Sequence, residues 1–128
     1  MGAVKNKVKE ILIVEDNEEM QALYRRMFMG YSGQYTVEIV GEAKQAIKKM
    51  DAKNFDLIIL DIIMEPIDGE TFYSYLRNNL HEWKIPVLVV SVIEPQELHY
   101  MKEINRVEFM QKPVSEDVLI KRIQKIIG

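Results

Sequence analysis

The chain has 128 residues, which is the usual size of one domain. It contains no cysteine, so a disulfide framework, a thiol nucleophile and a cysteine zinc site are excluded. Lys and Arg number 17 against 20 Asp and Glu, and the net charge of −3 argues against a module that binds nucleic acid through bulk positive charge. The apolar runs are too short to span a membrane and the N-terminus lacks the pattern of a signal peptide, so we expect one cytoplasmic domain over residues 1–128, with its core over about 9–127.

Five short apolar segments recur along the chain, and their composition is typical of β-strands. The first, third and fourth are continuously apolar and rich in branched residues, as in strands that are covered on both faces of a parallel sheet. The second and fifth are shorter or more mixed, which is typical of edge strands. In chain order the predicted strands are Glu10–Val14, Thr36–Val40, Asp56–Leu60, Ile85–Val90 and Glu108–Met110.

Each predicted strand is followed by a segment with the character of a helix. Asn17 and Ser115 are suitable caps for the first and last of these helices, and Pro95 suits the first turn of the fourth. In chain order the predicted helices cover residues 17–28, Ala43–Met50, Thr71–Asn79, residues 95–104 and Ser115–Ile127. Strand and helix therefore alternate five times, which predicts a doubly wound α/β fold with helices on both faces of a five-stranded parallel sheet.

In such a fold the functional site lies beyond the carboxyl ends of the strands. Glu15 and Asp16 follow the first predicted strand, and Asp61 follows the third. If these strands are neighbours, the three carboxylates lie close together, and their like charges disfavour one another unless a cation lies among them. A hard divalent ion fits the oxygen ligands, and Mg²⁺ is the preferred choice because it takes one or two carboxylates together with waters and phosphate oxygens.

A carboxylate can also act as a nucleophile and form an aspartyl phosphate. Phosphoryl transfer needs mainly positioning and charge neutralisation, and Lys112 and Ser91 follow the fifth and fourth predicted strands. A lysine can pair with a carboxylate at rest and with a phosphoryl group later, and a serine hydroxyl can bond a phosphoryl oxygen. Taken singly, each of these residues has an ordinary structural explanation as a cap, turn, strand-end or solvated residue. Their joint occurrence at the correct strand ends favours a phospho-aspartate site.

These motifs resemble the receiver domain of two-component response regulators, over nearly the whole chain. The matching stretches are ILIVEDNEE, GEAKQAIKKMDAKNFDLIILDIIMEPIDGETF, IPVLVVS and EFMQKPVSEDVLIKRI. The resemblance implies a flavodoxin-like three-layer sandwich with strand order 2-1-3-4-5. It also implies that Asp61 accepts a phosphoryl group from a sensor histidine kinase or a phosphotransfer protein, with Mg²⁺ or Mn²⁺ as cofactor. The domain would assist its own phosphorylation and dephosphorylation without being an enzyme that acts on a separate substrate.

The same resemblance assigns roles at the site. Glu15 and Asp16 form an acidic pair that holds the metal together with Asp61 and the backbone carbonyl of Ile63, and Asp16 is the more direct ligand. Lys112 neutralises the phosphoryl group, and the bond between it and the following proline is expected to be cis.

A second set of implied roles concerns the response. Ser91 takes the position of the switch hydroxyl and Phe109 that of the switch aromatic residue. The surface of the helix over 95–104, the fifth strand and the last helix would then change shape for an output domain, an effector protein or a second copy of the chain. Direct contact with nucleic acid or a membrane is not expected.

The chain departs from the family pattern near the acceptor. Glu65 replaces the usual proline, with Pro66 after it, and Val92 stands where a small residue is usual. Ile63 and Ile93 are apolar at positions where polar side chains can orient the water that hydrolyses the phosphoryl group. We therefore expect slow autodephosphorylation, with a phosphorylated lifetime of minutes to hours.

Three alternatives remain open. One is a receiver-like interaction module that works without phosphorylation. Another is an aspartyl-phosphate hydrolase, although such enzymes place a second aspartate where Ile63 stands here. The last is a flavodoxin-like cofactor carrier, whose phosphate-binding loop would not begin with acidic residues such as Glu15, Asp16, Glu18 and Glu19.

Overall fold

The computed structural model describes residues 7–63, 69–79, 84–94, 96–97 and 107–128. Most of the predicted helix over 95–104 lies outside these residues, as do Glu65 and Pro66.

The centre of the molecule is a parallel sheet of five strands. They are β1 (Lys9–Val14), β2 (Tyr35–Val40), β3 (Leu57–Leu60), β4 (Val87–Ser91) and β5 (Val107–Gln111). Their order is β2-β1-β3-β4-β5, and every neighbouring pair is parallel. The predicted topology is confirmed. The order reverses between β1 and β3, so the edge of the sheet beyond these two strands is the place where such folds bind their ligands.

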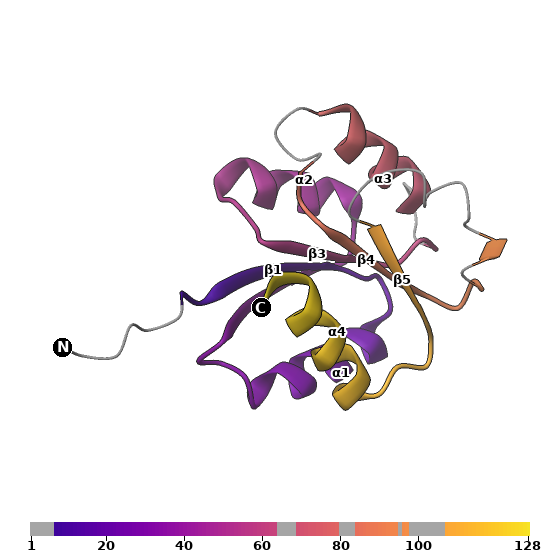
Figure 1. Cartoon of the computed structure of the whole chain (residues 1–128). Helices are drawn as coiled ribbons and strands as arrows, with labels where there is room; N and C mark the ends of the chain where they lie inside the picture. Colours follow the sequence, from indigo (N-terminus) through magenta and orange to yellow (C-terminus); the bar gives the residue numbers. More distant parts are fainter. Residues whose placement is uncertain (1–6, 64–68, 80–83, 95, 98–106) are drawn as a thin grey trace.

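Helices cover both faces of the sheet (Figure 1). α2 (Ala43–Ala52) and α3 (Gly69–Asn78) lie on one face, and α1 (Glu18–Met29) and α4 (Glu116–Ile127) lie on the other. Alternate residues of the central strands feed the two cores because successive side chains of a strand point to opposite faces. Leu12 and Val14 join the core under α2 and α3, whereas Ile11 and Ile13 join the core under α1 and α4.

The observed element ends differ from the predicted ones by a few residues. Asp56, for example, precedes β3 instead of opening it. Its side-chain Oδ2 accepts the N–H of Glu10 at 2.7 Å, and its own N–H donates to the carbonyl of Glu10 at 2.8 Å. The side chain of Asp56 thus replaces a ladder bond and aligns the start of β3 with β1. Both predicted caps are confirmed, since Asn17 and Ser115 accept bonds from the first turns of α1 and α4.

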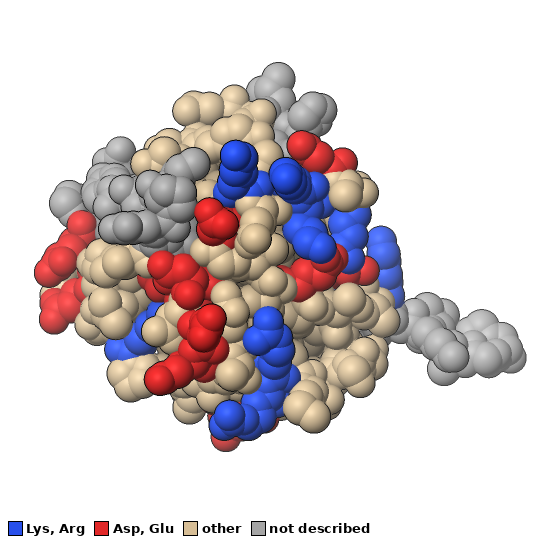
Figure 2. Space-filling model, turned by 180° about the vertical axis from the view of Figure 1, so that it is seen from behind, with Lys and Arg blue, Asp and Glu red and all other residues tan. Residues whose placement is uncertain are grey.

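Charged side chains of both signs are interspersed on the face that Figure 1 hides (Figure 2). One mixed cluster joins the edge strand to α2, where Lys49 and Lys53 both pair with Glu38. Among the described residues, no helix is both long and apolar enough to cross a membrane.

Candidate functional site

The carboxyl ends of β1 and β3 bring three acidic residues together. Val14 pairs with Leu60 across the two strands, so Glu15 and Asp61 leave the sheet side by side. The N–H of Asp61 donates to the carbonyl of Val14 at 3.1 Å, which extends the ladder by one residue. One carboxylate oxygen from each of Glu15, Asp16 and Asp61 lies within 4.8 Å of the other two. The convergence that the strand pattern predicts is therefore present.

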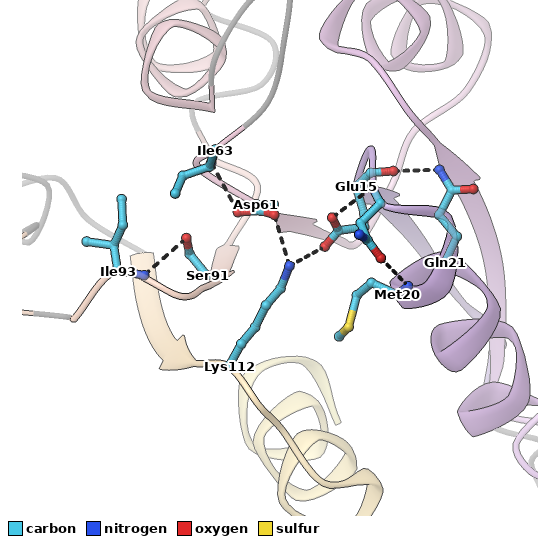
Figure 3. A network of polar contacts seen from close by, with 9 residues as sticks. Glu15, Met20, Gln21, Asp61, Ile63, Ser91, Ile93 and Lys112 are labelled. Atoms are coloured by element: carbon cyan, nitrogen blue, oxygen red, sulfur yellow. Dashed lines mark hydrogen bonds and ion pairs between the residues drawn. The ribbon is translucent and has the colours of Figure 1, made fainter.

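Lys112 joins this group from the end of β5. Its backbone N–H donates to the carbonyl of Ser91 at 2.8 Å, which continues the β4–β5 pairing past the last strand residue. Its Nζ lies 2.8 Å from Oε1 of Glu15 and 2.9 Å from Oδ2 of Asp61 (Figure 3). The following peptide bond, to Pro113, is cis. One ammonium group thus bridges two carboxylates that come from different strands.

The carboxylate of Glu15 is buried, with 1% of the residue exposed. Besides Lys112, it accepts the backbone N–H of Asn17 at 3.2 Å. Burial raises the pKa of Glu15 and the charge of Asp61 raises it further, while Lys112 opposes both effects. Burial lowers the pKa of Lys112, but its hydrogen bonds to Glu15 and Asp61 raise it by more, so the ammonium form is favoured. The lysine therefore stays charged at neutral pH.

The donor set fits a divalent cation. Three carboxylates face one ammonium group, which leaves an excess of two negative charges in a small volume. Asp16 is exposed, so its oxygens are accessible from solvent, whereas Glu15 and Asp61 are buried. All of these donors are hard oxygens, which Mg²⁺ and Mn²⁺ prefer. Glu15, Asp16 and Asp61 are the residues that would hold such an ion.

Asp61 and Ser91 each hold the loop that follows their own strand. Oδ1 of Asp61 accepts the N–H of Ile63 at 3.1 Å, and Oγ of Ser91 accepts the N–H of Ile93 at 3.5 Å (Figure 3). Ser91 is buried and lies at the end of β4, next to β3 in the sheet. The hydroxyl therefore comes from the strand that neighbours the one carrying Asp61.

Apolar side chains border the pocket that opens onto Asp61 and Lys112. Ile63 and Val92, two of these residues, are 53% and 60% exposed. The side-chain amide of Gln111 donates to the carbonyl of Val92 at 3.1 Å, so the loop after β4 is tied to β5. Ile63 and Val92 thus form an apolar border on one part of this pocket, while Asp16, Asn17 and Glu19 contribute polar groups to its lining.

Phe109, the predicted switch aromatic residue, is partly buried. It packs against the core under α2 and α3 and pairs with Val89 across β4 and β5. Its carbonyl accepts a bond from Arg122 of α4 at 3.4 Å. Phe109 thus lies two residue pairs before the level of Ser91, on a strand whose backbone is tied to α4.

Sequence reasoning missed several groups that shape this site. The hydrogen bonds of the Gln21 and Gln111 side chains could not be predicted, because a polar residue on a helix face or at a strand end is not part of any hydrophobic repeat. The bond from the backbone N–H of Asn17 could not be predicted either, because every residue type except proline carries this group. Tyr24 lies on the buried face of α1. It is buried, and burial together with the nearby charges of Glu15 and Asp61 raises its pKa, so its hydroxyl stays protonated.

Comparison with known proteins identifies the arrangement. The profile of the response regulator receiver domain matches residues 11–124. The chain belongs to this family. It is 27% identical over 117 residues to the CAI-1 autoinducer sensor kinase/phosphatase CqsS of Vibrio cholerae, a match that covers 90% of the chain and 17% of that protein. The chain thus spans only a small part of that relative.

Solved structures agree with the family assignment. The signal receiver domain of a signal transduction histidine kinase from Syntrophus aciditrophicus has a TM-score of 0.80 at 25% identity and covers 94% of this chain and 90% of its own. The receiver domain of the sensor histidine kinase PA1611 from Pseudomonas aeruginosa, solved with magnesium in its active-site cleft, shares the fold. Its TM-score is 0.82 at 23% identity, with 95% of this chain and 99% of its own covered.

Proposed function

We propose that this receiver domain accepts a phosphoryl group on Asp61 from the phosphohistidine of a sensor histidine kinase or a phosphotransfer protein. The observation that carries the proposal is the position of Lys112, whose ammonium group bridges Glu15 and Asp61 at 2.8 and 2.9 Å. A cation that is held against a buried carboxylate and still faces an open pocket is suited to neutralise charge that arrives there.

Glu15, Asp16 and Asp61, together with the backbone carbonyl of Ile63, are the proposed ligands of Mg²⁺ or Mn²⁺. The bound ion would supply positive charge to the oxygens of the transferring phosphoryl group. Asp16 offers the most accessible carboxylate, while Glu15 also holds Lys112 in place.

In the transfer step, a carboxylate oxygen of Asp61 attacks the phosphorus atom of the phosphohistidine. A phosphorus–oxygen bond forms as the phosphorus–nitrogen bond breaks, and the electron pair of that bond leaves with the imidazole. The N–H of Ile63 and the ammonium of Lys112 hold the two oxygens of Asp61, so the carboxylate is oriented before the donor arrives. The chain's contribution is therefore positioning and charge neutralisation.

The product adds about two negative charges where Asp61 carried one. Lys112 then exchanges its contact with the carboxylate for one with a phosphoryl oxygen, and the Ser91 hydroxyl turns from the N–H of Ile93 toward another phosphoryl oxygen. Movement of Ser91 vacates space that Phe109 fills. The surface of β5 and α4 changes shape in consequence and signals to an output domain or effector protein, or to a second copy of the chain.

The test is phosphorylation in vitro. The purified chain is incubated with Mg²⁺ and a small phosphodonor, and intact mass is compared with that of an Asp61→Asn variant. We expect a gain of one phosphoryl group in the unmodified chain and none in the variant, and beryllofluoride should shift the amide resonances of the unmodified chain alone. Absence of any Asp61-dependent change would instead support an interaction module that works without phosphorylation.

A further inference from the structure

Gln21 connects α1 to the backbone of the acidic pair. Its side-chain Nε2 donates to the main-chain oxygen of Glu15 at 2.6 Å (Figure 3). That oxygen belongs to the peptide group whose nitrogen is the backbone nitrogen of Asp16. The backbone N–H of Gln21 donates to the carbonyl of Asn17 at 2.9 Å, so the glutamine lies on the first turn of the helix. A rigid element therefore holds the peptide that leads into Asp16.

The rest of Glu15 is anchored by other elements. Its backbone N–H donates to the carbonyl of Val40 at 2.9 Å, and its carboxylate accepts bonds from Lys112 and Asn17. The bond from Gln21 adds the main-chain oxygen to this set. Sheet, helix and lysine together determine where the chain turns from β1 toward Asp16.

Gly41 lies close to the same peptide and to the side-chain amide of Gln21. A Cβ atom at Gly41 would lie 3.4 Å from Nε2 of Gln21, 3.9 Å from the main-chain oxygen of Glu15 and 4.0 Å from Cα of Asp16. The N–H of Gly41 in turn donates to Oε1 of Gln45 at 3.0 Å. The bond from Gln21 to Glu15 thus lies beside the segment that joins β2 to α2, where a side chain at position 41 would contact it.

We propose that Gln21 is a positioning residue for the metal site, and this inference rests on the proposed role of Asp16 as a ligand. Burial holds the side chains of Glu15 and Asp61, but Asp16 is exposed, so the direction of its carboxylate depends on the backbone that carries it. Gln21 fixes the plane of the Glu15–Asp16 peptide. It thereby keeps the oxygens of Asp16 near those of the other two carboxylates.

The experiment measures Mg²⁺ affinity directly. Gln21→Met keeps the length of the side chain and removes the donor, and Gln21→Ala removes the donor at a helical position where alanine is well tolerated. Gln124→Met, at an exposed glutamine of α4 far along the chain, is the matched control. Backbone amide shifts are followed during titration with MgCl₂, and thermal unfolding is measured without metal.

We expect both Gln21 variants to bind Mg²⁺ about 3- to 10-fold more weakly than the unmodified chain, below the 10- to 100-fold effect of losing a partner that bonds a ligand directly. The carbonyl ¹³C resonance of Glu15 in the metal-free protein should shift in both variants, which a change in overall stability alone would not produce. Gln124→Met should leave both quantities unchanged.

An affinity within about twofold of the unmodified chain in both Gln21 variants would overturn the inference, even if their unfolding temperatures fell. An equal loss of affinity in Gln124→Met would overturn it as well. If the unmodified chain itself bound no Mg²⁺, the proposed metal site would fail, a result distinct from failure of the role of Gln21.

Discussion

The ammonium nitrogen of Lys112 lies 2.9 Å from Oδ2 of Asp61, although the two residues are 51 positions apart in the chain. The pair forms because β3 and β5 flank β4 in a parallel sheet, so their carboxyl ends open onto the same edge. The same lysine also holds Glu15, and the two carboxylates therefore share one positive charge. Added negative charge at Asp61 would therefore change how Lys112 is shared between Glu15 and Asp61.

Replacement of Lys112 by methionine should destabilise the fold in the absence of metal. The change leaves Glu15 and Asp61 buried as neighbouring carboxylates without their cation, and we expect a loss of about 1–3 kcal/mol in the free energy of unfolding, measured by urea denaturation. Mg²⁺ should restore more stability to this variant than to the unmodified chain, because the ion supplies the missing charge. Lys121→Met, at an exposed position of α4, is the control. Equal stability of the Lys112 variant and the unmodified chain would show that the bridge contributes nothing.

The exposed apolar side chains of Ile63 and Val92 predict a long-lived phosphorylated state. Neither side chain can orient water by a hydrogen bond, so hydrolysis should proceed in minutes to hours at neutral pH, timed as decay of the phosphorylated mass after the donor is removed. Ile63→Asn should accelerate the decay severalfold, because the amide can position a water near the phosphorus atom. Val118→Asn, at an exposed apolar residue of α4, should leave the rate unchanged. A half-life of seconds in the unmodified chain would contradict the prediction.

Much of this site could be predicted because it depends on topology. Hydrophobic periods located the strand ends, and a parallel sheet places all such ends on one edge, so Asp61, Ser91 and Lys112 could be grouped before any distance was known. The bonds of Gln21 and Gln111 to backbone carbonyls could not be predicted in this way. These bonds depend on the rotamer of a polar side chain and on where a loop turns. Neither property produces a repeating pattern of apolar residues in the sequence.

If Ser91 and Phe109 are coupled, the Phe109→Ala variant should keep phosphorylation at Asp61 but lose much of the conformational change that follows it. The variant should still accept a phosphoryl group at Asp61, while the amide shifts that beryllofluoride induces in α4 should shrink, because no ring remains to fill the space that Ser91 vacates. Loss of the partly buried ring should also cost about 2–3 kcal/mol of stability. Val107→Ala, on the same face of β5, controls for that loss of packing. Full-size shifts in the Phe109 variant would count against the coupling.

The ion pairs of Glu38 predict a pH-dependent contribution to stability that is separate from the phosphorylation site. Hydrogen bonds from Lys53 and Lys49 lower the pKa of Glu38 below its ordinary value of 4.5. A carboxyl with a lowered pKa in the folded state stabilises that state above pH 4.5, and the effect is lost as the pH falls through the folded-state value. Glu38→Gln should therefore be less stable than the unmodified chain by about 0.5–1 kcal/mol at pH 7, a small effect because both ion pairs lie at the surface, with the lysine side chains 48% and 38% exposed. Urea denaturation at pH 7 and at about pH 3 should show this difference in stability shrinking on acidification.

Asp51→Asn, at an exposed carboxylate of α2, is the control. If the stability difference between Glu38→Gln and the unmodified chain persisted at the lower pH, Glu38 would stabilise the fold through packing instead of charge.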